Sequence, residues 1–168
     1  AIMTNSGSSA NLLSIALLKI KYPKGGEIIV PPITWSSDIS SVLHFNFTPV
    51  FVDINLNNLS MNDDLIISKI NKKTKAIFLS HIQGFNGLTK KLLDTIKKKK
   101  ILLIEDVCES HGASFKNKKL GSYGWTSNFS FYYAHHMTTI EGGMISTNDK
   151  WAYNSLLMLR SHGMAREV

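Results

Sequence analysis

The chain has 168 residues, of which 43% are hydrophobic and 18% charged, a composition that excludes disorder and is typical of one globular domain. No apolar run approaches the roughly 20 residues that a membrane span needs, and the start AIMTNSGSSA lacks the features of a secretory leader. The single cysteine, Cys108, can form neither an internal disulfide nor a thiolate cluster. We therefore expect a cytoplasmic protein with no cysteine-based metal site.

The net charge of +7 raises the question of nucleic-acid binding. No aromatic residues are interleaved with the lysines, so the sequence offers no stacking platform for bases. The lysines gather in runs that usually solvate a surface or end a helix: Lys72, Lys73, Lys75, Lys90, Lys91 and Lys97–Lys100. We expect neither nucleic acid nor membrane as a partner, although a basic surface can attract an anionic small molecule.

Short apolar runs alternate along the chain with segments of helical period. The runs suit buried strands and cover 27–31, 49–54, 76–82, 101–106, 128–133 and 143–148. The helical patterns between them include SSANLLSIALLKIKY, DDLIISKINKK and TKKLLDTIKKK. Strands that are apolar on both faces indicate a mainly parallel sheet covered by helices, so we predict a three-layer α/β/α sandwich that binds ligands at the carboxyl ends of its strands.

No internal repeat, low-complexity tract or linker divides the chain, so residues 1–168 are predicted to form one domain. The chain begins without Met and stops soon after a helical pattern. We therefore expect a piece of a longer enzyme, without its small carboxyl-terminal domain.

The first candidate site segment is NSGSSANLL, which places Ser6, Gly7 and Ser8 at the start of a helix. Free backbone N–H groups, hydroxyls and the positive end of the helix dipole suit a phosphate there, but a plain N-cap would have the same sequence. Farther along, Trp35 follows the predicted strand at 27–31. Its indole could stack on a flat ring or fill the core, and the sequence leaves both open.

Two later strand ends carry ionisable residues. Glu105 and Asp106 end the predicted strand at 101–106, where a buried carboxylate needs a cationic partner such as a pyridinium N–H. His135 and His136 follow the strand at 128–133, and an imidazole there could accept and return a proton near neutral pH. A phosphate cup, a stacking ring, a carboxylate and a basic residue are together the parts of a pyridoxal phosphate site.

The motifs resemble those of the nucleotide-sugar aminotransferases of fold type I, the DegT/StrS group. In order along the chain, they are NSGSSANL, PPITW, FVDI, EDVCESHGA, SFYYAHHMTTIEGG and LRSHG. The resemblance covers nearly the whole chain and implies the large domain of a fold-type I enzyme. It also implies a homodimer with sites at the subunit interface.

One residue departs from the aminotransferase pattern. Where those enzymes carry the lysine that holds the cofactor covalently, this chain has His135, and no lysine occurs between Lys119 and Lys150. An imidazole cannot form a stable imine with the cofactor aldehyde. The paired histidines before EGG instead resemble the sugar 3-dehydratase branch, in which a histidine replaces the lysine.

The resemblance to the dehydratases implies a cofactor held noncovalently as pyridoxamine phosphate, interconverted with pyridoxal 5'-phosphate. The reaction would remove the C3 hydroxyl of a nucleotide-linked 4-keto-6-deoxyhexose, with glutamate as amino donor. It implies His135 as the catalytic base, with His136 in a supporting place. The cofactor-binding residues that it implies are Gly7, Ser8, Trp35, Asp106, Glu109 and Ser130.

Three alternatives stay open at this point: an aminotransferase, a catalytically inactive homologue in which His135 is structural, and a binding module without activity. Tyr133 stands where those dehydratases have proline, which leaves the identity of the sugar open. An iron–sulfur cluster with a reductase in place of glutamate is also open. Cys108 alone cannot ligate a cluster, so we expect any cluster ligands to lie outside residues 1–168.

Overall fold

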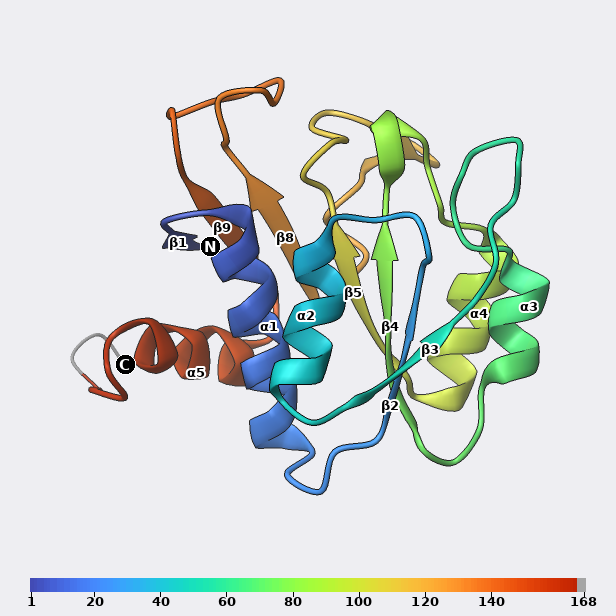
Figure 1. Cartoon of the computed structure of the whole chain (residues 1–168), viewed down its shortest axis with the longest axis horizontal. Coiled ribbons are helices and arrows are strands. Elements are labelled where there is room, and N and C mark those ends of the chain that lie inside the picture. The colour runs from blue at the N-terminus through green and yellow to red at the C-terminus, as the bar shows by residue number, and fades with distance from the viewer. Residues whose placement is uncertain (166–168) are drawn as a thin grey trace.

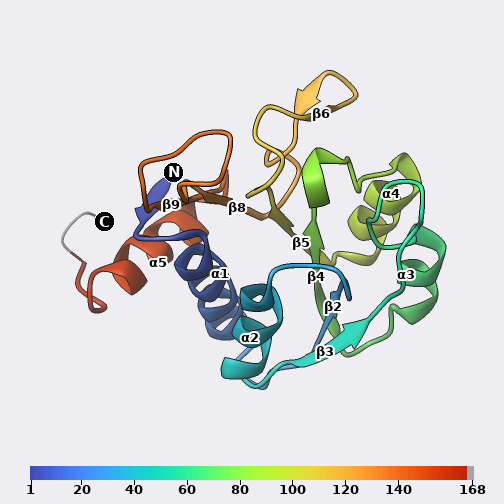
Figure 2. The ribbon, with the colours of Figure 1, turned by 45° about the horizontal axis from the view of Figure 1, so that its top comes forward.

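A seven-stranded sheet forms the centre of the structure, a computed structural model that describes residues 1–165 (Figure 1). The strands lie in the order β1-β9-β8-β5-β4-β2-β3. Their bounds are β1 Ile2–Thr4, β2 Glu27–Val30, β3 Thr48–Phe51, β4 Thr74–Ser80, β5 Leu102–Asp106, β8 Thr126–Ser130 and β9 Gly143–Ser146. A separate hairpin of β6 (Ser114–Phe115) and β7 (Lys118–Lys119) projects from the sheet (Figure 2).

The sheet is mainly parallel, as predicted. Strands β3, β2, β4, β5 and β8 run parallel, and β9 is antiparallel to both of its neighbours. The register pairs Ser80 at the end of β4 with Asp106 at the end of β5, and Asp106 in turn with Asn128 of β8. The carboxyl ends of these strands therefore meet at one edge, where polar side chains gather.

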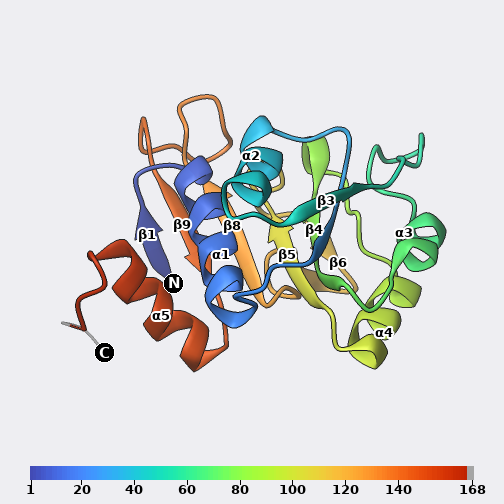
Figure 3. The ribbon, with the colours of Figure 1, turned by 60° about the horizontal axis from the view of Figure 1, so that its bottom comes forward.

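Helices cover both faces of the sheet, which confirms the three-layer sandwich (Figures 2 and 3). One face carries α1 (Gly7–Lys21), α2 (Ser36–His44) and α5 (Lys150–Arg160), and the other carries α3 (Asp63–Lys69) and α4 (Lys90–Lys99). The alternation along β4 explains this: Ala76 and Phe78 pack in the core on the α1 and α2 side, while Ile77 and Leu79 pack on the α3 and α4 side. All four are fully buried.

The sequence-based prediction differs from the structure where local patterns are weak. Strand β8 ends at Ser130 rather than at residue 133, because the chain turns there. In this turn, the backbone N–H of His135 donates a hydrogen bond to Tyr132 O at 3.0 Å. The predicted helix from residue 63 ends at Lys69, since Ile70 is extended. Helix α2, strand β1, the β6–β7 hairpin and the short 3₁₀ helix Ile82–Gly84 were not predicted. None of the helices in the described part of the chain is long and apolar enough to cross a membrane.

Candidate active site

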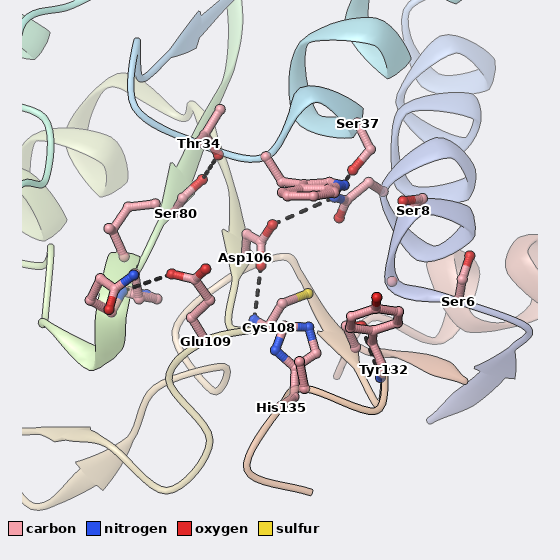
Figure 4. A pocket seen from close by; sticks show the side chains of 18 of the residues that line it. Ser6, Ser8, Thr34, Ser37, Ser80, Asp106, Cys108, Glu109, Tyr132 and His135 are labelled. Atoms are coloured by element: carbon pink, nitrogen blue, oxygen red, sulfur yellow. Dashed lines mark hydrogen bonds between the residues drawn. The ribbon is translucent and has the colours of Figure 1, made fainter. Parts of the chain in front are cut away.

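A cavity of about 630 Å³ opens at the carboxyl edge of the parallel strands. Figure 4 shows side chains from several elements around it, among them Ser8, Asp106, Glu109 and His135. The seven residues assigned to the site by the sequence analysis line this cavity: Gly7, Ser8, Trp35, Asp106, Glu109, Ser130 and His135. Glu105, the other strand-end carboxyl group, does not line it and accepts a hydrogen bond from Gly121 N at 2.9 Å. The fold thus brings together residues that lie up to 128 positions apart, from Gly7 to His135 (135 − 7).

The first turn of α1 forms one end of the cavity. Ser6 caps the helix, its Oγ accepting a hydrogen bond from Ser9 N at 3.1 Å. Gly7 and Ser8 are the first residues of the helix, where N–H groups have no partner within the helix. Gly7 lies against Ser130 at the end of β8, since a Cβ atom at Gly7 would come within 2.5 Å of Ser130 Cβ. The absence of a side chain therefore lets the helix start approach β8 and leaves a polar cradle suited to an anion.

Trp35 stands directly before α2 and is 70% exposed. A core residue of this size would be buried, so the structure rules out the interpretation of Trp35 as a core plug. The indole lines the cavity and leaves its surface free for a planar ligand.

Asp106 ends β5 and is 7% exposed. Its Oδ1 accepts a hydrogen bond from Cys108 N at 2.9 Å, and its Oδ2 lies 3.5 Å from Asn11 Nδ2. Within residues 1–165, no lysine, arginine or histidine forms an ion pair with this carboxyl group. A buried carboxylate without a cation matches a ligand that brings one, such as a protonated ring nitrogen.

A second carboxyl group, Asp38 of α2, lies behind Asp106 and is fully buried. Burial raises the pKa of Asp38 well above its usual range, and the nearby Asp106 adds to the effect. Asn11 connects the two carboxyl groups and accepts a hydrogen bond from Asn128 Nδ2 at 2.9 Å. Asn128 Oδ1 accepts in turn from Ser14 Oγ at 2.7 Å. This polar network fixes α1 and α2 against the end of the sheet.

His135 lies in the turn after β8 and is half-buried. Its ring packs edge-on against Tyr132 and His111, with centroids 5.9 and 6.1 Å away. No hydrogen bond to the imidazole nitrogens is found within residues 1–165, so both remain available for proton transfer. His135 also lines an adjoining polar recess of about 230 Å³ together with Glu109 and His136. His136 itself is exposed, with its ring 6.2 Å from that of His111.

Glu109 and Cys108 follow Asp106 along the wall of the cavity. Glu109 Oε2 accepts a hydrogen bond from Gln83 N at 2.9 Å, which joins the loops after β4 and β5. Burial, followed by the charge of Asp106, raises the pKa of the Cys108 thiol well above its usual range, so the thiol is neutral.

His81 follows β4 and is buried. Burial lowers its pKa to about 4, and its Nδ1 accepts a hydrogen bond from Gly87 N at 3.1 Å. The neutral ring of His81 therefore carries its proton on Nε2.

Sequence reasoning missed several cavity residues. Ser80 ends the buried strand β4 and His81 follows it, so the same strand-end rule that identified Asp106 could have found them. Asn11 and Thr34 carried no such signal, because a polar residue on a helix or in a loop usually faces solvent. In the described part of the chain, no three His, Cys, Asp or Glu side chains are placed to hold a metal ion.

Comparison with known proteins places these residues in context. Residues 1–168 match the DegT/DnrJ/EryC1/StrS aminotransferase family. GDP-4-keto-6-deoxy-D-mannose 3-dehydratase of Escherichia coli O55:H7 is 39% identical over 172 residues, which cover 100% of this chain and 44% of that protein. The structure of the E. coli enzyme with bound hydrated PLP superimposes with a TM-score of 0.94 at 38% identity, over 99% of this chain and 44% of that one.

A further structure, of GDP-4-keto-6-deoxymannose-3-dehydratase with a trapped PLP–glutamate geminal diamine, has the same TM-score of 0.94 and 38% identity. The match covers 99% of this chain and 44% of that one. The chain thus spans less than half the length of these relatives.

Proposed function

Because the chain belongs to the DegT/DnrJ/EryC1/StrS aminotransferase family, we propose that residues 1–168 form the cofactor-binding large domain of a pyridoxamine phosphate-dependent sugar 3-dehydratase. One observation carries this proposal. The cavity combines a polar cradle, a stacking ring, a carboxylate without a cation and a histidine, yet no lysine lines it among residues 1–165. Such a site can hold pyridoxal or pyridoxamine phosphate but offers no lysine amine to form an imine with it.

The residues fit the parts of this cofactor. Gly7 and Ser8 at the start of α1, with Ser130 opposite, would hold the phosphate through N–H and hydroxyl donors. Trp35 would stack on the ring, and Asp106 would keep the ring nitrogen protonated. Glu109 would contact the cofactor from the wall between the two recesses.

The bound cofactor supplies an amino group for the C4 ketone of the sugar and a ring that withdraws electrons from its methylene carbon. His135 would take the proton from that carbon on one of its ring nitrogens. It would then return a proton to the C3 hydroxyl as that group leaves. One side chain would thus act first as base and then as acid.

The substrate class follows from the relatives. We propose a nucleotide-linked 4-keto-6-deoxyhexose, with GDP as the nucleotide by similarity to the E. coli enzyme, whose name states that substrate. Glutamate is the proposed amino donor, supported by the related structure with a PLP–glutamate adduct. We further propose a homodimer, as the family resemblance implies. We place it in the cytoplasm, in line with the unpaired Cys108.

The test uses the full-length protein with pyridoxal phosphate, glutamate and GDP-4-keto-6-deoxymannose. We expect a product that has lost the C3 hydroxyl, detected by mass spectrometry, and no cofactor attached covalently after borohydride treatment. Covalent attachment in the parent protein would favour an aminotransferase and would contradict the role of His135. A His135→Lys variant serves as the control: a protein that only binds the cofactor would show no turnover in either form.

A further inference from the structure

Thr34, Asp38 and Ser80 bring three side-chain oxygen atoms into mutual contact beneath the cavity. Ser80 Oγ lies 2.7 Å from Asp38 Oδ2 and 2.6 Å from Thr34 Oγ1. Thr34 Oγ1 also hydrogen-bonds Asp38 Oδ2, which closes a ring of three oxygens. Asp38 is fully buried, so solvent cannot relieve an unfavourable contact at this carboxyl group.

The number of hydrogen atoms in this ring depends on Asp38. Each of the three oxygen–oxygen contacts needs one hydrogen between its atoms. The hydroxyls of Thr34 and Ser80 supply two, and an ionised carboxylate supplies none. If Asp38 is ionised, one pair of oxygens meets without a hydrogen. If Asp38 carries a proton on Oδ2, every oxygen donates once and accepts once.

The other oxygen of Asp38 faces the second carboxyl group. Asn11 Nδ2 donates to Asp38 Oδ1 at 2.6 Å and to Ser37 Oγ at 3.1 Å, and it lies 3.5 Å from Asp106 Oδ2. One amide nitrogen thus sits between two buried carboxyl groups. Neither group forms an ion pair with any residue that the structure describes. Two neighbouring buried carboxyl groups without a cation oppose each other's ionisation.

The remaining titratable groups nearby do not supply a cation. Cys108 faces both carboxyl groups as a neutral thiol, and His81 beside Asp106 is neutral because burial lowers its pKa to about 4. Glu109 adds a further acid beside Cys108. The charged residues of the elements packed on α2 contact other groups: Lys19 the ring of Phe47, Lys21 the rings of Trp125 and Trp151, and Glu27 the amide of Asn71.

We propose that Asp38 is a positioning residue held as a neutral carboxylic acid, so that the two carboxyl groups beneath the cavity carry one negative charge, on Asp106. Through Asn11, this neutral acid fixes the Asp106 carboxylate that, under the proposed function, holds the ring nitrogen. A single charge matches a single ring cation. Ionisation of Asp38 would leave one contact of the oxygen ring without a hydrogen and would place a second, unpaired charge behind the site.

Isotope-edited infrared spectroscopy of the cofactor-free, full-length protein tests this directly. With ¹³C-carboxyl aspartate, a protonated aspartate gives a carboxylic-acid band that shifts with the label. The label also separates Asp38 from Glu105, whose pKa burial raises to about 7. We expect a labelled carboxylic-acid band at pH 7 in the parent protein. Its absence would overturn the proposal.

Variants assign the band. Asp38→Asn should remove it, whereas the matched control Asp53→Asn, at an exposed aspartate, should leave it unchanged. Ser80→Ala removes one hydroxyl of the ring and should shift the band, which keeps the assignment testable if Asp38→Asn does not fold. A band that survives Asp38→Asn, or one unmoved by Ser80→Ala, contradicts the proposal.

The pH dependence of Tm separates a protonated Asp38 from a purely structural one. A purely structural role would give a difference in Tm between the parent and Asp38→Asn that does not change with pH. Folding raises the pKa of Asp38, so the folded state keeps a proton that the unfolded chain releases above about pH 4. This group therefore makes the parent protein lose stability as pH rises toward the folded-state pKa. Asp38→Asn lacks that loss, so its Tm should rise relative to the parent as pH increases, and a difference independent of pH would refute the inference.

These measurements need no cofactor. A protein that shows the Asp38 band but binds no pyridoxamine phosphate would disprove the proposed function and leave the protonation of Asp38 intact. A protein that binds pyridoxamine phosphate but lacks the band would disprove the protonation of Asp38 and leave the proposed function intact.

Discussion

Ser8 is the second residue of α1, and its side chain lines the cavity opposite Ser130. If this end holds the cofactor phosphate, Ser8→Ala removes one hydrogen bond to a charged group. Affinity for pyridoxamine phosphate should then fall by about 1 kcal/mol or more. Equilibrium dialysis measures this, with Ser40→Ala on the exposed side of α2 as the matched control. An unchanged affinity in Ser8→Ala would place the phosphate elsewhere.

Asp106 acts through its charge, which an isosteric amide removes. Asp106→Asn should lower both cofactor affinity and the rate of sugar deoxygenation, because an amide cannot keep the ring nitrogen protonated. Fluorescence titration with pyridoxamine phosphate and a product assay measure the two effects side by side. If the variant deoxygenates the sugar at the parent rate, the ring nitrogen is not held at Asp106.

Single residues differ in how much their sequence context revealed. Asp106 ends the buried strand β5 and His135 follows β8, and the geometry of a parallel sheet brings such residues to one edge. Ser130, the last residue of β8, was implied only by the family resemblance. Asp38 and Asn11 have no such signal. They are polar residues on helices, and only the packing of α1 against α2 and β8 shows that they are buried.

At the level of elements, the approach of α1 to the end of β8 shapes the cavity. Gly7→Ala would place a Cβ atom 2.5 Å from Ser130 Cβ and 3.2 Å from Cys108 Sγ. Because both neighbours are packed, α1 must shift, and we expect a loss of about 1–3 kcal/mol in the free energy of unfolding. Cofactor affinity should fall as well.

Chemical denaturation and cofactor titration measure the two effects of Gly7→Ala. The control is Gly112→Ala, at a positive φ of +86° with no atom within 4 Å of the added Cβ. Backbone strain should lower its stability while cofactor affinity stays at the parent value. If Gly7→Ala binds the cofactor as well as Gly112→Ala does, the approach of α1 to β8 does not form the phosphate cradle.

Elements with strong apolar patterns were predictable, and those that depend on distant partners were not. Strands β4 and β5 are continuous apolar runs, so the sequence located them within two residues at each end. Helix α2 is rich in serine, and its buried residues Ser37, Asp38 and Ser41 are polar. Strand β1 is three residues long, and its one partner among residues 1–165 is β9, more than 130 residues away (Ile2 with Ile145). No local pattern identifies such a strand.

At the scale of the whole molecule, several large apolar side chains are exposed. Trp35, which lines the cavity, is 70% exposed, and Tyr133 and Ile140 in the segment between β8 and β9 are 67% and 78% exposed. Exposed apolar side chains of this size are in line with the proposed homodimer. Sedimentation velocity of the full-length protein should show a dimer at micromolar concentration. A protein that stays monomeric there would count against the assignment.

Under the proposed function, His135 is the base that removes the methylene proton of the cofactor. In the full-length protein in deuterated water, with pyridoxamine phosphate and GDP-4-keto-6-deoxymannose, the parent should exchange that proton with solvent. His135→Asn should keep the fold and the cofactor but lose both exchange and deoxygenation by roughly 100-fold or more, while the neighbouring His136→Asn should change neither. If His135→Asn exchanges the methylene proton at the parent rate, His135 is not the base.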